Sequence, residues 1–331
     1  MEGRFLKKIM LLILTCIFIV LLSACGNINS EKKDVSSNNK LKIYTTAFAF
    51  QSFTNQIGGK YVDVDSIYPP GADMHSFEPT QKEMINIAKS DFFIYSNEEM
   101  DPVAKKIARS INNDNLKLPV AVHLSHHDLI ANHEEHDEHE NHDEHDHHAH
   151  HEDHDHGKQD PHVWLDPVLN KKFAKVIKDD LIEKDPKHKT YYTRNYNHLI
   201  KDIDEIDNEM KRITQHPKRD TAIISHDSIG YLANRYHFKQ QGVSGMNNEE
   251  PSQRELMDIV RNIDKTKQPY VLYEQNITSK VTDVIQKESN TTPLKFHNMA
   301  TLSKEEVKDK QITYQSLMKE NMKSLNRALN Q

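Results

Sequence analysis

The sequence predicts an α/β protein made of two parallel-sheet lobes that are joined by one long rigid helix. At 331 residues the chain is long enough for two domains. Strand-like and helix-like segments alternate on both sides of residues 186–214, which favours a parallel sheet in each half. Residues 186–214 keep one helical spacing of apolar residues, which is typical of a single helix. We therefore expect a first lobe over 41–185, a linker helix over 186–214 and a second lobe over 215–331.

The first lobe is expected to begin with a strand, a short helix and a second strand. Residues 41–47 (LKIYTTA) alternate in the way that a half-buried strand does. A short helix is expected over 50–57. Residues 61–68 (YVDVDSIY) alternate apolar and polar side chains and predict the second strand, which ends at Pro69-Pro70-Gly71.

Local signals also predict where the next two helices begin. Thr80 and Glu83 have the spacing of a capping box, which marks the start of a helix. A strand follows at 91–95 (DFFIY). Asp101 precedes Pro102, so the pair is expected to form the N-cap and the first residue of another helix.

The linker helix is predicted from a sustained apolar stripe. Its apolar residues recur at spacings of three and four: Tyr192, Tyr196, Leu199, Ile203, Ile206, Met210 and Ile213. The Asp185-Pro186 break separates it from a preceding helix. The stripe fits either a coiled-coil dimer or one helix packed along both lobes of a monomer. We favour the monomer because strand–helix alternation resumes after residue 214.

The second lobe is expected to carry polar side chains where its strands end. His226, Glu274 and His297 each directly follow a predicted strand, and Asp227 and Ser228 can cap the next helix. The predicted strands are 221–225, 270–273 and 294–296, and the predicted helices end at 234 or span 281–287 and 312–329. Ligands of open α/β sheets bind at the carboxyl ends of the strands, so this edge is the expected binding edge.

Residues 131–156 (ANHEEHDEHENHDEHDHHAHHEDHDH) form a very polar insertion in the first lobe. Eleven histidines and eleven acidic residues leave almost no apolar surface to offset the entropy of ordering, which predicts a disordered loop. Imidazole and carboxylate are ligands of divalent transition metals, so metal capture is favoured over a solvated spacer or an expression tag. The auxiliary ligands, expected to hold additional ions weakly, are His133, His136, His139, His142, His145, His147, His148, His150, His151, His154 and His156.

The N-terminus has the pattern of an export signal. Basic residues precede an apolar run over 9–22, which ends in LSACG. This ending resembles the lipobox of bacterial lipoproteins, which implies cleavage before Cys25 and a lipid on its sulfur. The alternative is an ordinary signal peptide with an incidental cysteine. We therefore expect a signal peptide over 1–24, a lipidated tether over 25–40 and an extracytoplasmic protein anchored to the cell membrane.

The charge distribution argues against a nucleic-acid partner. The whole chain carries a net charge of −7 and the insertion carries −11, which leaves +4 for all other residues. Such a balance gives no basic surface for a phosphate backbone.

Four histidines outside the insertion occupy positions that suit a specific metal site: His75, His162, His226 and His297. Two lie in loops of the first lobe and two at strand ends of the second lobe. Three or four converging imidazoles suit tetrahedral Zn²⁺, whereas a carboxylate-rich site would suit Mn²⁺ or Ca²⁺. The sequence therefore predicts zinc, with tighter Cu²⁺ binding in vitro by the Irving–Williams order.

Three motifs around these histidines resemble those of the zinc-binding solute-binding lipoproteins of bacterial ABC importers, of the ZnuA and AdcA kind. The motifs are residues 71–80 (GADMHSFEPT), residues 160–167 (DPHVWLDP), and residues 225–227 (SHD) together with 231–233 (YLA). His226 marks the zinc branch of this family, whose manganese relatives carry a glutamate there. The resemblance covers the whole mature body. It implies one tight Zn²⁺ in the cleft between the lobes and delivery to an ABC permease with its cytoplasmic ATPase.

The fourth ligand is the point at which the sequence departs from that family. Relatives carry an aspartate at the position of His297, or a glutamate three residues further on, where this chain has Ala300. His297 is the expected fourth ligand, with Glu274 or a water as alternatives. Candidates to accept the second N–H of a ligating imidazole are Glu78, Asp160 and Asp166, of which the last two could instead cap turns.

The leading function is zinc capture for import by a monomeric, non-enzymatic subunit. One alternative is a surface adhesin or zinc store, which would act without a partner permease. A less favoured alternative is a secreted zinc hydrolase with Glu274 as its general base. The folded body lacks the His-Glu-x-x-His spacing that many such enzymes carry on a helix.

Overall fold

The computed structural model describes residues 34–130, 159–246, 249–275 and 280–331. The predicted signal peptide, Cys25 and the histidines of the insertion lie outside these ranges. Residues from Val35 onward form one compact unit, and Val35 itself is buried, so this unit begins within the segment expected to be a tether. Within the described ranges, no helix has both the length and the apolar character needed to cross a membrane.

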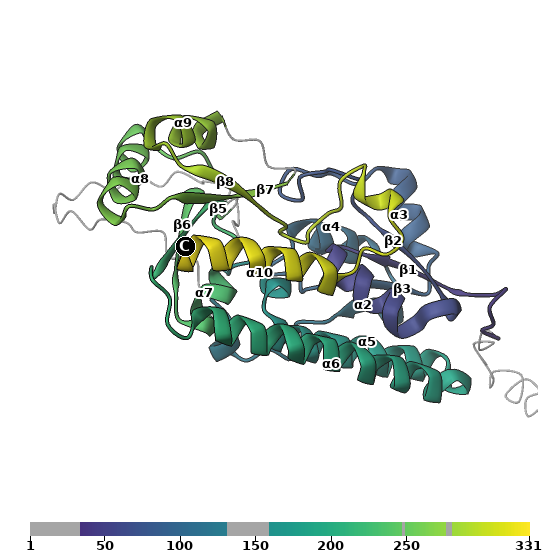
Figure 1. The fold of residues 1–331 in the computed structure, drawn as a ribbon. Coiled ribbons are helices and arrows are strands. Elements are labelled where there is room, and N and C mark those ends of the chain that lie inside the picture. Colours follow the sequence, from purple (N-terminus) through teal and green to yellow (C-terminus); the bar gives the residue numbers. More distant parts are fainter. Residues whose placement is uncertain (1–33, 131–158, 247–248, 276–279) are drawn as a thin grey trace, which may run out of the picture. The chain divides into compact units, whose positions relative to one another are not determined.

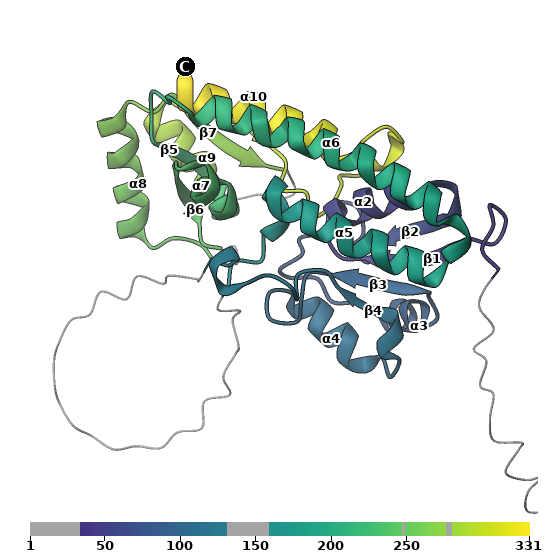
Figure 2. The same cartoon turned by 90° about the horizontal axis from the view of Figure 1, so that it is seen from below.

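The first lobe contains a parallel four-stranded sheet in the order β2-β1-β3-β4 (Figure 1; β4 is labelled in Figure 2). The strands are β1 Leu41–Thr45, β2 Val62–Ser66, β3 Phe92–Tyr95 and β4 Lys117–Pro119. Helix α2 covers one face of this sheet, and α3 and α4 cover the other (Figure 2). These helices span α2 Phe48–Gly58, α3 Gln81–Ala88 and α4 Pro102–Ser110.

The second lobe repeats this topology, with a parallel sheet in the order β6-β5-β7-β8. The strands are β5 Thr221–His226, β6 Lys239–Ser244, β7 Tyr270–Glu274 and β8 Thr292–Phe296. Its helices are α7 Gly230–Tyr236, α8 Gln253–Thr266 and α9 Lys280–Ser289. The predicted architecture of two parallel α/β lobes is therefore confirmed.

The predicted long helix is α6, which spans Lys189–Thr214. Its apolar stripe packs against α2 and α5 (Pro167–Lys184) of the first lobe and α10 (Tyr314–Asn330) of the second (Figure 2), and all of its residues are buried except the half-buried Tyr196. Because these partners belong to the same chain, the stripe needs no second copy to cover it. Leu199, Ile203 and Met210 are all buried in a hydrophobic core that extends into both lobes.

The local helix signals behaved as predicted in the first lobe. Thr80 and Glu83 form a complete capping box at the start of α3. The side chain of Asp101 accepts the Ala104 N–H at the start of α4. The corresponding prediction for α7 was wrong: its N-cap is Ile229, without a side-chain cap, because the Ser228 hydroxyl donates to Glu274 instead.

The segment that follows β8 connects the second lobe to the first. Helix α2 has no side-chain cap, and its first N–H groups donate to this segment, Phe48 to the Ala300 carbonyl at 2.9 Å and Ala49 to the Met299 carbonyl at 3.3 Å. Gly71 donates its N–H to the Leu302 carbonyl at 2.8 Å. The bonds of Phe48 and Ala49 satisfy helix-end donors that would otherwise be unpaired. The bond of Gly71 holds the start of the loop that carries His75.

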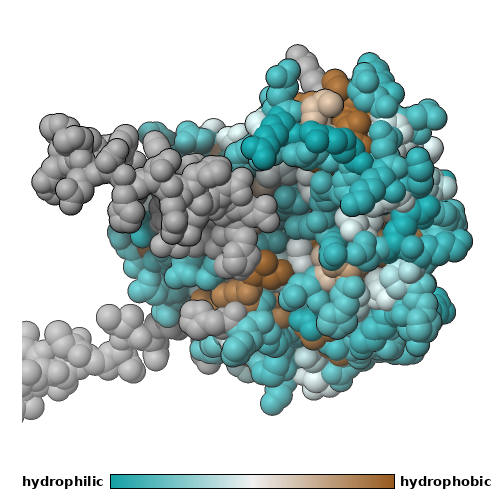
Figure 3. Space-filling view, turned by 90° about the vertical axis from the view of Figure 1, so that its left-hand side faces the viewer, coloured by the Kyte–Doolittle hydropathy of each residue, from teal (hydrophilic) through white to brown (hydrophobic). Residues whose placement is uncertain are grey.

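Hydrophobic side chains are confined to small, separate areas on the face shown in Figure 3. Most of the other described residues visible on that face are hydrophilic, and some are of intermediate hydropathy. Isolated apolar residues of this kind are normal on protein surfaces and do not indicate an interaction site.

Candidate metal centre

Three histidines from distant parts of the chain meet in one group: His75, His162 and His226. One ring nitrogen from each lies within 4.8 Å of the others. The ring centroids are 5.7 Å apart for His75 and His162, 5.3 Å for His75 and His226, and 4.9 Å for His162 and His226. Among the residues that the structure describes, this is the one group of three or more His, Cys, Asp or Glu side chains with such spacing.

Each histidine is placed by a different kind of local structure. His226 is the last residue of β5, at the carboxyl end of the central strand pair of the second sheet. His162 directly precedes a 3₁₀ turn, Val163–Leu165, where the described chain resumes after the insertion. His75 lies in the loop between β2 and α3, which passes through Gly71 at a φ of 80° that favours glycine.

His162 is completely buried and has one free ring nitrogen. Its Nδ1 lies 2.8 Å from Oδ1 of Asp160, and the same oxygen accepts its backbone N–H at 2.8 Å. Its Nε2 is buried without any hydrogen-bond partner. Because Asp160 accepts the Nδ1 proton, the lone pair on Nε2 is free to bind a metal ion.

His226 is held by two oxygens. Its Nδ1 lies 2.8 Å from Oε2 of Glu274, and its Nε2 lies 2.8 Å from the backbone carbonyl oxygen of Met246. The Ser228 hydroxyl donates to the other carboxylate oxygen of Glu274. Both carboxylate oxygens of Glu274 are therefore engaged within the second lobe.

The charges of the site follow from burial and from these partners. Burial, with the neighbouring His226, lowers the pKa of His162 to about 3. Burial, with the neighbouring His162 and His226, also lowers the pKa of His75 to about 3. Burial disfavours a charge on His226 as well, but Glu274 outweighs it and raises the pKa of His226 to about 9. Two of the three imidazoles are therefore neutral and able to donate a lone pair to a cation.

The Asp160 carboxyl is also buried, and this raises its pKa to about 7. Burial works in the same direction on Glu274, but the charge of His226 holds the pKa of Glu274 below its usual value. The pKa values of these two carboxyls thus shift in opposite directions, because Glu274 is in direct contact with His226, the imidazole whose pKa is raised.

His297, the expected fourth ligand, lies outside the group of three. Its Nδ1 accepts the Met299 N–H at 2.9 Å, and its Nε2 lies 3.4 Å from Oε2 of Glu306. Its backbone N–H donates to Asn321 of α10 at 2.7 Å. In this structure His297 anchors the segment that follows β8 rather than joining the other histidines.

The other sequence candidates have different partners. Glu78 forms an exposed ion pair with Lys106. Asp166 caps α5 through the Val168 and Leu169 N–H groups. Its side chain also pairs with Arg235. Its contacts therefore agree with the alternative of a capping residue rather than an acceptor for a ligating imidazole. Met246 was missed in the sequence, since a backbone carbonyl has no residue-type signal.

Trp164 packs directly beside the centre. Its ring lies edge-on to His162 at 5.5 Å between centroids, and its Nε1 donates to the Asn298 carbonyl at 2.7 Å. It therefore joins the His162 turn to the segment after β8.

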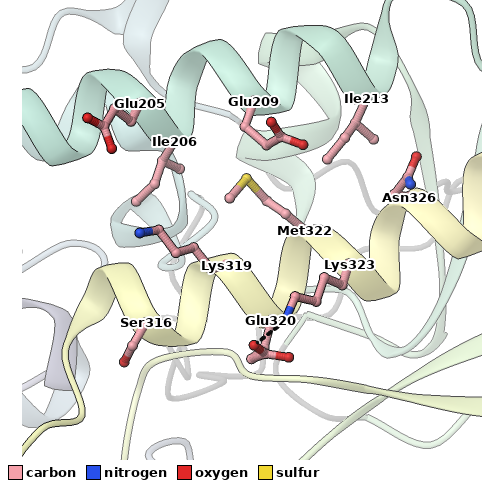
Figure 4. A pocket seen from close by; sticks show the side chains of 10 residues that line it. All are labelled: Glu205, Ile206, Glu209, Ile213, Ser316, Lys319, Glu320, Met322, Lys323 and Asn326. Carbon is pink, nitrogen blue, oxygen red and sulfur yellow. Dashed lines mark hydrogen bonds and ion pairs between the residues drawn. The ribbon is translucent and has the colours of Figure 1, made fainter.

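A separate pocket of about 550 Å³ lies between α6 and α10 (Figure 4). Ile206, Ile213 and Met322 contribute apolar side chains, and charged side chains of both helices surround them. None of its lining residues is a histidine, and Lys323 pairs with Glu320. We assign it no role in metal binding.

The sequence profile of the family ZnuA, zinc-uptake complex component A, periplasmic, matches residues 43–328. The chain is similar to the high-affinity zinc uptake system protein ZnuA of Bacillus subtilis, with 32% identity over 312 residues that cover 94% of each protein. It is 28% identical to the zinc-binding lipoprotein AdcA of Streptococcus pneumoniae over 329 residues, which cover 98% of this chain and 62% of AdcA.

Solved structures share the fold. The metal-dependent lipoprotein YcdH of Bacillus subtilis matches with a TM-score of 0.69 and 28% identity, covering 88% of this chain and 99% of that one. The periplasmic zinc-binding protein TroA of Treponema pallidum matches with a TM-score of 0.74 and 18% identity, covering 88% and 100%, and at that identity supports the fold alone. From the profile match and the 32% identity over nearly the whole length, the chain belongs to the ZnuA family of zinc-uptake binding components.

Proposed function

We propose that this chain captures Zn²⁺ outside the cytoplasm and delivers it to the permease of an ABC importer. His75, His162 and His226 would bind the Zn²⁺ ion, which is the cargo that the chain carries. The observation that carries this assignment is the Nε2 atom of His162, which is buried without a hydrogen-bond partner and belongs to the group of three imidazoles. A buried polar atom without a partner costs about 1–3 kcal/mol, which binding of a cation would recover.

The two carboxylates beside the site support this role. Asp160 contacts Nδ1 of His162 and Glu274 contacts Nδ1 of His226, each at 2.8 Å. Such partners fix the orientation of a ligating imidazole and leave Nε2 as the ligand atom. For His226 to bind zinc, its Nε2 must exchange the Met246 carbonyl and a proton for the metal.

We propose a water molecule as the fourth ligand. Glu274 already uses both of its oxygens, on His226 and Ser228. His297 is held by the Met299 N–H and lies beside Glu306. A three-histidine site with one water is a common arrangement for Zn²⁺.

Members of the ZnuA family are metal carriers and not enzymes. We therefore propose no reaction for Glu274. Its contact with His226 gives it a positioning role in place of the general-base role that a hydrolase would require.

We further propose that Cys25 carries a lipid that anchors the mature chain to the cell membrane. The insertion would gather zinc and raise its concentration near the specific site. Ile130 and Asp160 lie on either side of the insertion, and the Asp160 N–H donates to the Ile130 carbonyl at 3.0 Å, which keeps both of these flanking residues close to the turn of His162.

Zinc stoichiometry and affinity of the mature chain, with and without residues 131–156, test the proposed site. We expect one tight ion in both forms, with additional weaker ions only when the insertion is present. His75→Ala, His162→Ala and His226→Ala should each lose the tight ion. His198→Ala, which changes an exposed histidine of α6, is the matched control and should keep it. Absence of a tight ion from the shortened chain would contradict the proposal.

Delivery is tested separately in cells that depend on this chain for zinc. The wild-type chain should restore uptake of labelled zinc under chelation, whereas His162→Ala should not. If uptake is the same with and without the wild-type chain, the adhesin or storage alternative is preferred.

A further inference from the structure

Tyr231 of α7, in the second lobe, contacts Ile130 and Asp160 of the first lobe, which lie on either side of the insertion. Its hydroxyl donates to the Asp160 carbonyl at 3.0 Å and accepts the Ile130 N–H at 3.4 Å. Asp160 in turn donates its own N–H to the Ile130 carbonyl at 3.0 Å. Ile130, Asp160 and Tyr231 thus form a closed set of three hydrogen bonds, and Tyr231 is buried.

The same Asp160 contacts the proposed zinc ligand. Its Oδ1 accepts both the backbone N–H and the Nδ1 proton of His162. Its other oxygen faces Gly230, the residue before Tyr231: a Cβ atom on Gly230 would lie only 2.8 Å from Oδ2 of Asp160. The first turn of α7 therefore contacts Asp160 both at its backbone and at its carboxyl group.

We propose that Tyr231 is a positioning residue for zinc binding. It holds the backbone of Asp160, and through the Asp160 carboxylate it orients the ring of His162. Because Tyr231 belongs to the second lobe, it also fixes His162 relative to His226, which the second lobe supplies through β5. This inference rests on the proposed function, since it assigns His162 as a zinc ligand.

The chain supplies a matched control on the same helix. Tyr236 is also a buried residue of α7, and its hydroxyl donates to Oδ1 of Asp207 on α6 at 2.9 Å. Tyr231→Phe and Tyr236→Phe each remove one buried hydroxyl that donates to one oxygen. Only the first of these oxygens belongs to a residue that contacts His162.

The test is competition for Zn²⁺ between a chelator and the full mature chain. Tyr231→Phe should weaken the tight site on the order of tenfold, as is typical when the outer partners of a metal ligand are changed. Tyr236→Phe should bind within about twofold of wild type, although both variants lose similar thermal stability. The absorption spectrum of the Co²⁺-loaded protein should change in Tyr231→Phe and not in Tyr236→Phe, because it reports ligand geometry.

Two further variants test the route through Asp160. Gly230→Ala places its methyl group against Oδ2 of Asp160 and should weaken the site while Tyr231 is intact, which also covers the case that Tyr231→Phe fails to fold. The effects of Tyr231→Phe and Asp160→Asn should be non-additive in a double-mutant cycle.

Equal zinc affinity in wild type, Tyr231→Phe and Gly230→Ala would overturn the inference, as would equal weakening in Tyr236→Phe. Failure of the proposed function gives a different result, because wild type itself would then hold no tight ion.

Discussion

Oε2 of Glu274 lies 2.8 Å from Nδ1 of His226, and both side chains are completely buried. These residues end two neighbouring strands, β7 and β5, of the second sheet. Their contact fixes the His226 ring so that Nε2 points away from Glu274, toward the Met246 carbonyl. The alternative of Glu274 as the fourth metal ligand would break this contact.

Replacing Glu274 by Gln should weaken zinc binding by about tenfold or more. The side chain keeps its size but loses the negative charge that orients and polarises His226. Chelator competition measures the change. Glu306→Gln, which alters the carboxylate beside His297, is the control and should bind zinc normally. If Glu274→Gln binds zinc as tightly as wild type, then Glu274 has no role in zinc binding.

Replacing His297 by Asn should leave the affinity for the tight ion within about twofold of wild type. Asn keeps an acceptor for the Met299 N–H, because its Oδ1 can take the place of Nδ1, so the unfolding free energy should fall by less than about 1 kcal/mol. Zinc titration and thermal unfolding measure the two effects separately. Loss of the tight ion in this variant would instead make His297 the fourth ligand, as the sequence predicted.

Zinc binding should change the fluorescence of Trp164, which is the single tryptophan of the chain. Its ring lies 5.5 Å from that of His162 and shares the same buried environment. Titration of the mature chain should give a change that saturates at one equivalent of Zn²⁺. The change should vanish in His226→Ala and persist in His198→Ala. A signal that follows the weaker ions would show that the tight site lies elsewhere.

Asp101 should make the protein more stable as the pH falls from 7 toward 4. Burial raises the pKa of Asp101 from 3.8 to about 6 in the folded chain, so the folded state binds the proton more tightly than the unfolded state. The free energy of unfolding should therefore rise as the pH falls through about 6 and level off below about 4. The total gain from Asp101 is on the order of 2–3 kcal/mol.

Asp101→Asn should flatten this part of the stability profile, as measured by chemical unfolding between pH 4 and 7. Asn can still cap the Ala104 N–H, so the variant should be at least as stable as wild type at pH 7. Asp114→Asn, which changes an exposed carboxyl, should keep the wild-type slope. If the stability of Asp101→Asn depends on pH as that of wild type does, then Asp101 is not the source of this pH dependence.

Predictions from the sequence succeeded where the signal is local. The capping box of Thr80 and Glu83 and the Asp101-Pro102 pair fixed the starts of α3 and α4, because these contacts span only three residues. Strands β4 and β6 were missed. β6 carries Gln240, Gln241 and Gly242, and it is a strand because it pairs with β5. Helix α8 was also missed, although Ser252 and Glu255 form a capping box that the sequence displays.

The site was predictable in kind and only partly in detail. Strand ends and loop motifs singled out His75, His162 and His226, and the structure brings these three together. It leaves out His297, although that residue follows β8 directly. The reason is the orientation of the side chain, since the His297 ring contacts Met299 and Glu306. The spacing of residues in the sequence does not predict the orientation of a single side chain.

The sequence by itself therefore determined the α/β class, the long linker helix and the histidines that could bind a metal, because each depends on residue type or on periodicity along the chain. The family followed from the resemblance of its motifs to those of known proteins. The tertiary structure alone decided that Glu274 contacts His226, that Tyr231 bonds Asp160 and that His297 contacts Met299 and Glu306. These relationships join residues as far apart as 71 positions, at distances of about 3 Å. Contacts this close between distant segments depend on how whole helices and strands pack, and that information is spread over the entire core.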